Sequence, residues 1–283
     1  MHPVTAHRDR LIGFAYRMLG SVADAEDVIQ DAYQRVHDQA EVKLSSAYLM
    51  RVVSNLCVDR LRAEQVRRRE YSGPWLPEPL LDPSTPADVA QLSEDLSFGF
   101  LLLLERLSPA ERVVFVLREA FDYSFADIAE LLDLSVEACR QRFSRARRRF
   151  AGTELPVHEP VAEQKAMLER LVMLVSEGRV EGLVEMLSDD ALLISDGGGL
   201  VSAAVRPVAD RQRIARVLVH IAGRALQEGG LDYRFVNVNG GWGLIVLQSG
   251  APHSCITLES RDGLVRRVYI VRNPDKIRPI GSI

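Results

Sequence analysis

Three charged segments of the chain have compositions suited to contacts with other macromolecules. The segment "CRQRFSRARRRF" (139–150) carries six arginines and no acid, and "RLRAEQVRRRE" (60–70) carries five arginines against two glutamates. Arginine can pair bidentately with guanine and glutamine with adenine, while a plain positive charge suits phosphate. In contrast, "VADAEDVIQDAY" (22–33) carries four acids and no base. One acidic and two basic segments therefore predict two kinds of partner, one of them a nucleic acid.

Amphipathic periodicity places each charged segment on a helix. Apolar residues recur at helical spacing in 7–19, in the acidic segment that follows and in 47–70. Ser21 is the expected N-cap of the second helix, and Ser45 or Ser46 that of the third. The segment "SPAE" (108–111) is a helix start, with serine at the N-cap, proline at N1 and glutamate at N3. Ser124 caps the following helix, and a "DLS" turn leads from Ser135 into the arginine-rich segment.

Two short helices joined by such a turn, the second strongly basic, predict a helix-turn-helix. Its small core would contain Ile128, Ala129, Leu132, Leu134, Val136 and Phe143. The outward face of the second helix would present Arg140, Gln141, Ser144 and Arg145 to a major groove, with Arg147, Arg148 and Arg149 placed for phosphates. The alternative is that this arginine-rich helix is a solvated face. The turn, the caps and the absence of acids favour the DNA-binding interpretation.

A proline-rich linker (71–97) separates the two helical patterns, with a further helix expected over 87–107. Its opening, "YSGPWLPEPLLDPSTP" (71–86), contains a tryptophan and three leucines among the prolines. A segment that only crosses solvent gains nothing from a tryptophan. We therefore expect another surface to receive Trp75, Leu76 and Pro77, the alternative being local packing on a neighbouring helix.

From about residue 157 the pattern changes to α+β. Two helices, "EQKAMLERLVMLVSEG" and "RVEGLVEML", precede alternating segments such as "ALLISDGGGLVSAAVRPV", "YRFVNVNGGWGLIVLQSG", "HSCITLESRDG" and "LVRRVYIVRNP". Glycine-rich and Asn-Gly turns between β-branched runs predict an antiparallel sheet with hairpins.

Composition limits the remaining possibilities. A chain of 283 residues with 47% hydrophobic and 26% charged residues suits two or three globular modules, and its net charge of −4 argues against indiscriminate coating of nucleic acid. No apolar run reaches the length of a membrane span and no leader opens the chain, so we expect a cytoplasmic protein. The three cysteines are far apart, so neither a disulfide framework nor a metal site is expected, and no cofactor is predicted.

Two blocks of the sequence resemble bacterial RNA polymerase sigma factors of the extracytoplasmic-function type. "YRMLGSVADAEDVIQDAYQRV" and "AYLMRVVSNLCVDRLR" are similar to sigma region 2, and the segment that begins at "LSPAERVVF" is similar to region 4. The remainder resembles a SnoaL-like domain, a cone-shaped α+β fold. The resemblance implies region 2 over 1–70, region 4 over 98–152 and the SnoaL-like domain over 157–283, which makes a multidomain protein with two all-α sigma domains.

The resemblance also implies partners and contact residues. Core RNA polymerase would be bound by the acidic helix, through Asp24, Glu26, Asp27, Gln30 and Asp31, unless these residues are only a solvated face. Promoter DNA at the −10 element would be met, as the strands part, by Arg51, Asn55, Asp59, Arg60 and Arg62. The arginine-rich helix would read the −35 element.

The extension resembles that of the SigJ-like group, which shares "GPWLPEP", "SDGGG" and "NPDKI", although Leu200 replaces a lysine and Ile277 a leucine of the group's pattern. We expect the linker to dock there, through Trp75, Leu76, Pro77, Asp196, Gly197, Gly198, Asn273, Pro274, Asp275 and Lys276. The only polar candidates for a general base are Asp190, Asp196, His220, Asp232 and His253, and no pairing among them assigns roles. We therefore expect a fused regulator and no catalysis, with a small-molecule sensor or enzyme as the alternative.

Overall fold

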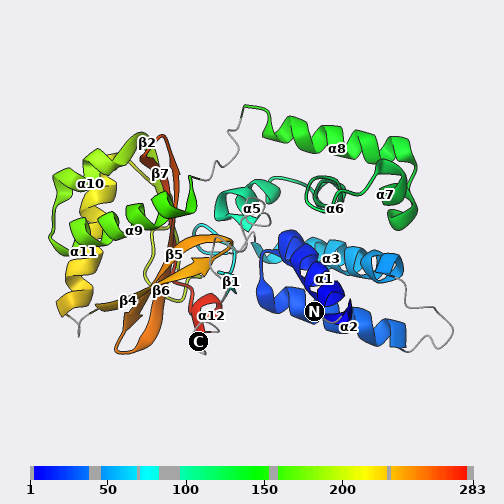
Figure 1. Ribbon diagram of the computed structural model, residues 1–283, viewed down its shortest axis with the longest axis horizontal. Coiled ribbons are helices and arrows are strands. Elements are labelled where there is room, and N and C mark those ends of the chain that lie inside the picture. Colours follow the sequence, from blue (N-terminus) through cyan, green and yellow to red (C-terminus); the bar gives the residue numbers. More distant parts are fainter. Residues whose placement is uncertain are drawn as a thin grey trace. The chain divides into compact units, whose positions relative to one another are not determined.

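The computed structural model describes residues 3–37, 46–68, 71–82, 96–152, 159–227 and 231–278 (Figure 1). The chain divides into a helical unit, residues 1–70 and 101–155, and a sheet unit, residues 71–100 and 156–283. The linker thus belongs to the sheet unit. Within the described ranges, no helix is long and apolar enough to cross a membrane.

The helical unit begins with three helices, α1 (Pro3–Leu19), α2 (Val22–His37) and α3 (Ser46–Arg68). Each buries one apolar stripe against the other two, with Leu11, Phe14, Ile29 and Val53 at 2% exposure or less. Gly20 adopts a positive φ of 71° between α1 and α2, and the Ser21 hydroxyl accepts the Asp24 N–H as the predicted N-cap. Ser45, one of the two predicted caps of α3, lies outside the described residues.

Four more helices follow the linker: α5 (Phe98–Leu104), α6 (Pro109–Glu119), α7 (Phe125–Leu132) and α8 (Val136–Phe150). Ser108 with Glu111 and Ser124 with Asp127 form complete capping boxes, and the Ser135 hydroxyl caps α8. The predicted helix over 87–107 is helical over 98–104, and its residues 87–95 lie outside the described ranges.

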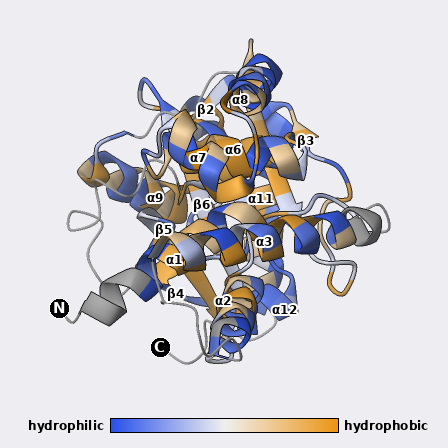
Figure 2. Cartoon of the chain, turned by 90° about the vertical axis from the view of Figure 1, so that its right-hand side faces the viewer, coloured by the Kyte–Doolittle hydropathy of each residue, from blue (hydrophilic) through white to orange (hydrophobic). Residues whose placement is uncertain are grey.

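The turn between α7 and α8 has the helix-turn-helix form. Asp133 ends α7 in the left-handed conformation, and Phe143 of α8 stacks on Phe115 of α6 with ring centroids 5.8 Å apart. Ile128 is fully buried as expected, whereas Leu132 and Leu134 are only half-buried because Leu131 and Cys139 fill the inner positions. Figure 2 colours α8 mostly hydrophilic and α6 largely hydrophobic.

Helices from both ends of the helical unit pack together, α1 and α3 against α6, and α3 against α7. Arg112 of α6, only 3% exposed, donates to the Met18 carbonyl at 2.7 Å and to Glu105 at 2.8 Å. Phe121 meets the Phe14 ring edge-on at 5.6 Å. The two halves of the helical unit therefore share one interior.

The described residues of the sheet unit form seven strands in the order β1-β4-β5-β6-β7-β2-β3. The strands are β1 (Leu81–Asp82), β2 (Leu187–Asp196), β3 (Val208–Ala209), β4 (Leu231–Val238), β5 (Gly241–Gln248), β6 (Ala251–Arg261) and β7 (Leu264–Val271). Helices α9 (Val161–Ser176), α10 (Val180–Met186) and α11 (Arg211–Gln227) cover one face, and α12 (Pro274–Ile277) follows β7 (Figure 1). Register shifts within three strand pairs bend the sheet around those helices.

Two features of the sheet unit differ from the sequence expectation. The expected sheet was antiparallel, and β4 to β7 do form hairpins, but β2 pairs with β7 in parallel. Parallel pairing needs a long connection, which α11 and the three hairpins supply. Helix α11 was not predicted from the sequence, and the strand segment predicted to run from 191 to 208 ends at Asp196 in β2. Helix α11 completes the core of this unit through Ile214, Ala215 and Leu218.

Candidate functional site

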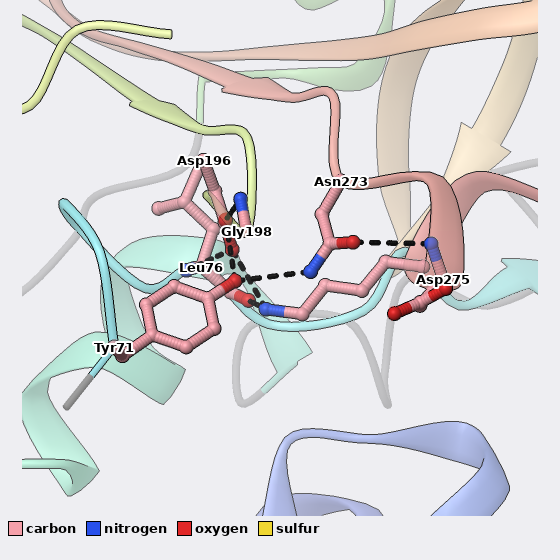
Figure 3. A network of polar contacts seen from close by, with 7 residues as sticks. Tyr71, Leu76, Asp196, Gly198, Asn273 and Asp275 are labelled. Carbon is pink, nitrogen blue, oxygen red and sulfur yellow. Dashed lines mark hydrogen bonds and ion pairs between the residues drawn. The ribbon is translucent and has the colours of Figure 1, made fainter. Parts of the chain in front are cut away.

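The linker is held on the sheet unit by the carboxylate of Asp196, which ends β2 and is fully buried (Figure 3). One oxygen, Oδ1, accepts from the Tyr71 hydroxyl at 2.6 Å and from the Gly198 N–H at 2.9 Å. The other, Oδ2, accepts from the Leu76 N–H at 2.9 Å and from Lys276 Nζ at 2.7 Å. Four donors from three separate segments therefore converge on one side chain.

Lys276 of α12 adds a second set of contacts to the same linker residues. Its ammonium group donates to the Leu76 carbonyl oxygen and lies 4.4 Å from the centre of the Trp75 ring and 5.4 Å from that of Tyr71. A cation over two aromatic faces is attracted by both. Leu76 is fully buried and Trp75 half-buried, so the leucine supplies the apolar anchor and the tryptophan a platform for the charge.

Asn273 fixes the remaining geometry. Its side-chain amide donates to the Tyr71 oxygen at 3.0 Å, while its carbonyl accepts the Asp275 N–H and caps α12 (Figure 3). We call this set the linker latch: Tyr71, Trp75, Leu76, Asp196, Gly198, Asn273 and Lys276. Burial, followed by the hydrogen bond to Asp196, raises the pKa of the Tyr71 hydroxyl, so it remains a donor.

Glycine is required where the "SDGGG" turn meets the latch. Gly198 has a φ of +65°, and a Cβ there would lie 2.5 Å from the Asn273 amide nitrogen. At Gly197 a Cβ would lie 2.4 Å from the Val201 carbonyl oxygen. Any side chain at these positions would displace Asn273 or distort the turn.

A second clamp holds the other end of the linker. Asn239, in the turn between β4 and β5, exchanges hydrogen bonds with Leu80 at 2.8 and 3.0 Å and donates from its side chain to the Leu96 carbonyl at 2.8 Å. Strand β1 of the linker pairs with β4, and the Phe98 ring stacks on Tyr269 at 5.8 Å. The sheet unit thus anchors the linker where it enters at 71 and where it leaves near 98.

Six of the ten residues predicted to hold the linker belong to the latch. Of the other four, Pro77 is buried next to Leu76, Gly197 lies in the adjacent turn, and Pro274 and Asp275 contribute through the backbone of α12. Tyr71 and Asn239 were not predicted from the sequence. The tyrosine directly before "SGPW" indicates packing, and the asparagine of an Asn-Gly turn indicates a hairpin. Neither pattern indicates a partner far away in the sequence.

Three of the five candidates for acid–base chemistry line one cavity, and the other two do not. Asp196 is occupied by the latch, and Asp190 is exposed and pairs with Arg266 at 2.6 Å, which lowers its pKa to about 2. His220, Asp232 and His253 line a cavity in the sheet unit, and Arg272 lies against His253.

The candidate polymerase-binding residues Glu26, Asp27, Gln30 and Asp31 are exposed on α2, and Asp24 is half-buried. On α3, the candidate −10 residues Arg51, Asn55, Asp59 and Arg62 are exposed, and Arg60 is half-buried. Arg60 forms ion pairs with Asp24 and Asp27. The sequence predicts a polymerase-binding surface for Asp24 and Asp27 and a DNA-binding surface for Arg60. The ion pairs bring these residues together at one edge because α2 and α3 are adjacent.

The recognition-helix candidates lie on one open face of α8. Arg140, Gln141, Ser144, Arg145 and Arg147 are all exposed, while Cys139 and Ala146 face inward. Glu111, the capping residue of α6, pairs with Arg149 at 3.1 Å and with Arg145 at 3.6 Å. These two ion pairs hold α8 against α6 and set Arg145 apart from the other recognition-helix candidates.

The three-helix bundle with its acidic face and the helix-turn-helix each match a family model. The family model for Sigma-70 region 2 matches residues 3–67, and that for Sigma-70 region 4 matches residues 98–150. The chain belongs to the extracytoplasmic-function (ECF) RNA polymerase sigma factors, with two sigma domains followed by an α+β domain.

Its similarity to one relative extends over nearly the whole chain. It is 35% identical to the ECF RNA polymerase sigma factor SigJ of Mycobacterium tuberculosis, across 96% of this chain and 91% of the relative. The crystal structure of that SigJ superposes with a TM-score of 0.76, covering 96% of this chain and 95% of the other at 31% identity. The probable ECF sigma factor SigI of the same organism is 31% identical over 64% of both chains.

Proposed function

We propose that this sigma factor directs core RNA polymerase to −10 and −35 promoter elements and is regulated by its own SnoaL-like domain through the linker latch. The acidic face of α2 binds the polymerase, α3 meets the −10 element and α8 reads the −35 element. The exposure of these charged faces supports the assignment, since each is open to a partner.

The observation that carries the regulatory part is the full burial of Asp196 with four donors, two of them from the linker. The linker is the only chain segment between region 2 and region 4. Because the sheet unit anchors both its ends, the length of chain available to separate the two regions depends on the latch. Holding or releasing the linker therefore changes whether the regions can adopt the spacing that a promoter requires.

Transcription by the full chain with purified core polymerase tests this proposal. Asp196→Asn replaces an acceptor of four hydrogen bonds, and we expect several-fold changed transcription from a cognate promoter. Asp190→Asn is the matched control, the same substitution on the same strand outside the latch, and should leave transcription unchanged. Equal transcription by both variants and the unsubstituted chain would refute regulation through the latch.

A second candidate function is that of a small-molecule sensor. The sheet unit contains a cavity of about 570 Å³, within the range that suits a small-molecule ligand.

A further inference from the structure

The cavity in the sheet unit has an apolar body. It lies between α9, α11 and the concave face of the sheet, and aliphatic side chains such as Leu171, Val217, Leu218, Leu244 and Ile270 line it. Removing apolar ligand surface from water against such walls is favourable. The walls therefore suit a hydrocarbon chain or ring system.

One end of the cavity carries a positive charge. Arg272, directly after β7, lines it and lies with Nη2 2.9 Å from Nε2 of His253. A guanidinium can only donate, and Nε2 of a neutral His253 can accept from it. Nη1 of Arg272 donates to the Ser202 carbonyl at 2.5 Å, so two contacts orient the guanidinium. The other titratable residues of the lining are all exposed: His220, Arg224, Asp232 and Tyr233.

A hydroxyl lies on the same part of the wall. Ser195, 5% exposed, precedes Asp196 on β2, and its oxygen accepts the Ala204 N–H at 2.8 Å. Because a hydroxyl oxygen that accepts one bond keeps its own proton, Ser195 can still donate. A planar guanidinium with a nearby hydroxyl donor suits a carboxylate, which accepts at both oxygens.

We propose that this cavity binds an amphipathic carboxylate, with the carboxylate on Arg272 and the apolar body between α9, α11 and the sheet. This proposal names a ligand class for the proposed regulatory role of the sheet unit. The binding itself does not require that role, and only its effect on transcription rests on the proposed function.

The proposed carboxylate site is one residue away from the linker latch both on β2 and in the segment after β7. Ser195 and Arg272 line the cavity, whereas their neighbours Asp196 and Asn273 belong to the latch. The N–H groups of Arg272 and Asn273 both donate to the Asp196 carbonyl, at 2.7 and 2.9 Å. A ligand that moves Arg272 therefore moves the backbone that positions the latch, and its occupancy should alter the surroundings of Trp75.

Calorimetric titration of the full chain tests the binding step. The probes are laurate, dodecanol and dodecyltrimethylammonium, which share a tail and differ in charge, each below its micellar concentration. We expect laurate to bind at one site per chain, at least about tenfold more tightly than dodecanol. Equal binding of laurate and dodecanol, preference for the cation, or no binding of laurate would overturn the proposal, and none of these results depends on a variant.

Two variants locate the charged contact. Arg272→Gln should weaken laurate binding about tenfold or more and leave dodecanol binding unchanged. Arg216→Gln removes the same charge from the exposed face of α11, outside the cavity, and should leave both probes unaffected. Equal effects of the two variants on laurate would overturn the assignment to Arg272.

Trp75 fluorescence tests the coupling to the latch. Trp75 and Trp242 are the two tryptophans of the chain, so Trp242→Phe leaves Trp75 as the reporter. We expect laurate, at the concentrations that saturate the calorimetric site, to change Trp75 emission, and Asp196→Asn to abolish that change. Laurate binding without a Trp75 response would overturn the coupling. Neither result depends on transcription, so a failure of this coupling can be distinguished from a failure of the proposed regulation of transcription.

Discussion

The helical unit and the linker latch place their charged residues in opposite environments. On α2 and α8, Asp31, Arg140 and Arg147 point into solvent. In the latch, Asp196 has no exposed surface and Lys276 keeps 12% of its side chain exposed. The first kind of charge is available to a partner molecule, and the second is already committed within the chain.

This difference predicts different consequences of substitution. An exposed ion pair contributes about 0–1 kcal/mol, so removing a surface charge leaves the fold nearly unchanged and affects binding alone. Removing one partner of a buried pair leaves the other desolvated and costs about 3–5 kcal/mol. Binding assays therefore probe the helical unit, and unfolding or hydrogen exchange probes the latch.

The largest expected effect is the loss of polymerase binding when the acidic face of α2 is reversed. Asp27→Lys with Asp31→Lys replaces two negative charges by positive ones, and we expect co-purification with core polymerase to be abolished. Thermal unfolding should change little because both residues are exposed. Unchanged capture of core in a pull-down at moderate salt would remove α2 as the contact surface.

The next effect is on the latch. Asp196→Asn should lower the free energy of unfolding of the sheet unit by about 3 kcal/mol, measured as a denaturant midpoint from Trp75 fluorescence, and amides 73–79 should lose protection from hydrogen exchange. Asp190→Asn, an exposed pair with Arg266, should cost less than about 1 kcal/mol. If the two substitutions cost the same, Asp196 is not a buried anchor.

A smaller effect separates base reading from phosphate contact on α8. Arg140→Ala should reduce discrimination at one position of the −35 element by about 1–3 kcal/mol, whereas Arg148→Ala should weaken all promoter sequences alike. Both residues are exposed, so neither change should unfold the helix. Binding measured on a set of single-base promoter variants checks this contrast, and a uniform loss for both would leave α8 with phosphate contacts only.

The smallest effect concerns alkaline pH. The pKa of Tyr71 is raised in the folded chain, first by burial and then by the hydrogen bond to Asp196. The unfolded tyrosine loses its proton near pH 10, so the folded state holds more protons above that pH and stability falls as pH rises. Tyr71→Phe should cost about 1 kcal/mol at neutral pH and should reduce the decline between pH 9.5 and 11. An unchanged slope in denaturant titrations would place Tyr71 outside the latch.

Local signals in the sequence predict the helical unit well. The starts of α6, α7 and α8 are determined within four residues, by serine side chains that cap backbone N–H groups, so no distant information is needed. The docking of the linker could be anticipated because a leucine and a tryptophan among prolines need a receiving surface.

The sheet unit depends more on contacts that the local pattern does not encode. The parallel pairing of β2 with β7 joins segments about 75 residues apart, such as Ser195 and Ile270. Asn239 has the residue type of a hairpin turn, and nothing adjacent to it indicates that its side chain binds Leu96. Helix α11 does have a local pattern in the sequence, because Asp210 caps it and an apolar stripe follows, although it was not predicted.

The long sequence separation within the latch has a consequence for newly synthesised chains. Leu76 and Lys276, which share a hydrogen bond, are 200 residues apart. At roughly 5–20 residues per second, a ribosome needs roughly 10–40 s to make the intervening chain. During that interval region 2 is complete while its linker lacks Lys276. Each nascent molecule therefore passes through an unlatched period, and the number of unlatched chains in a cell should rise in proportion to the rate of synthesis.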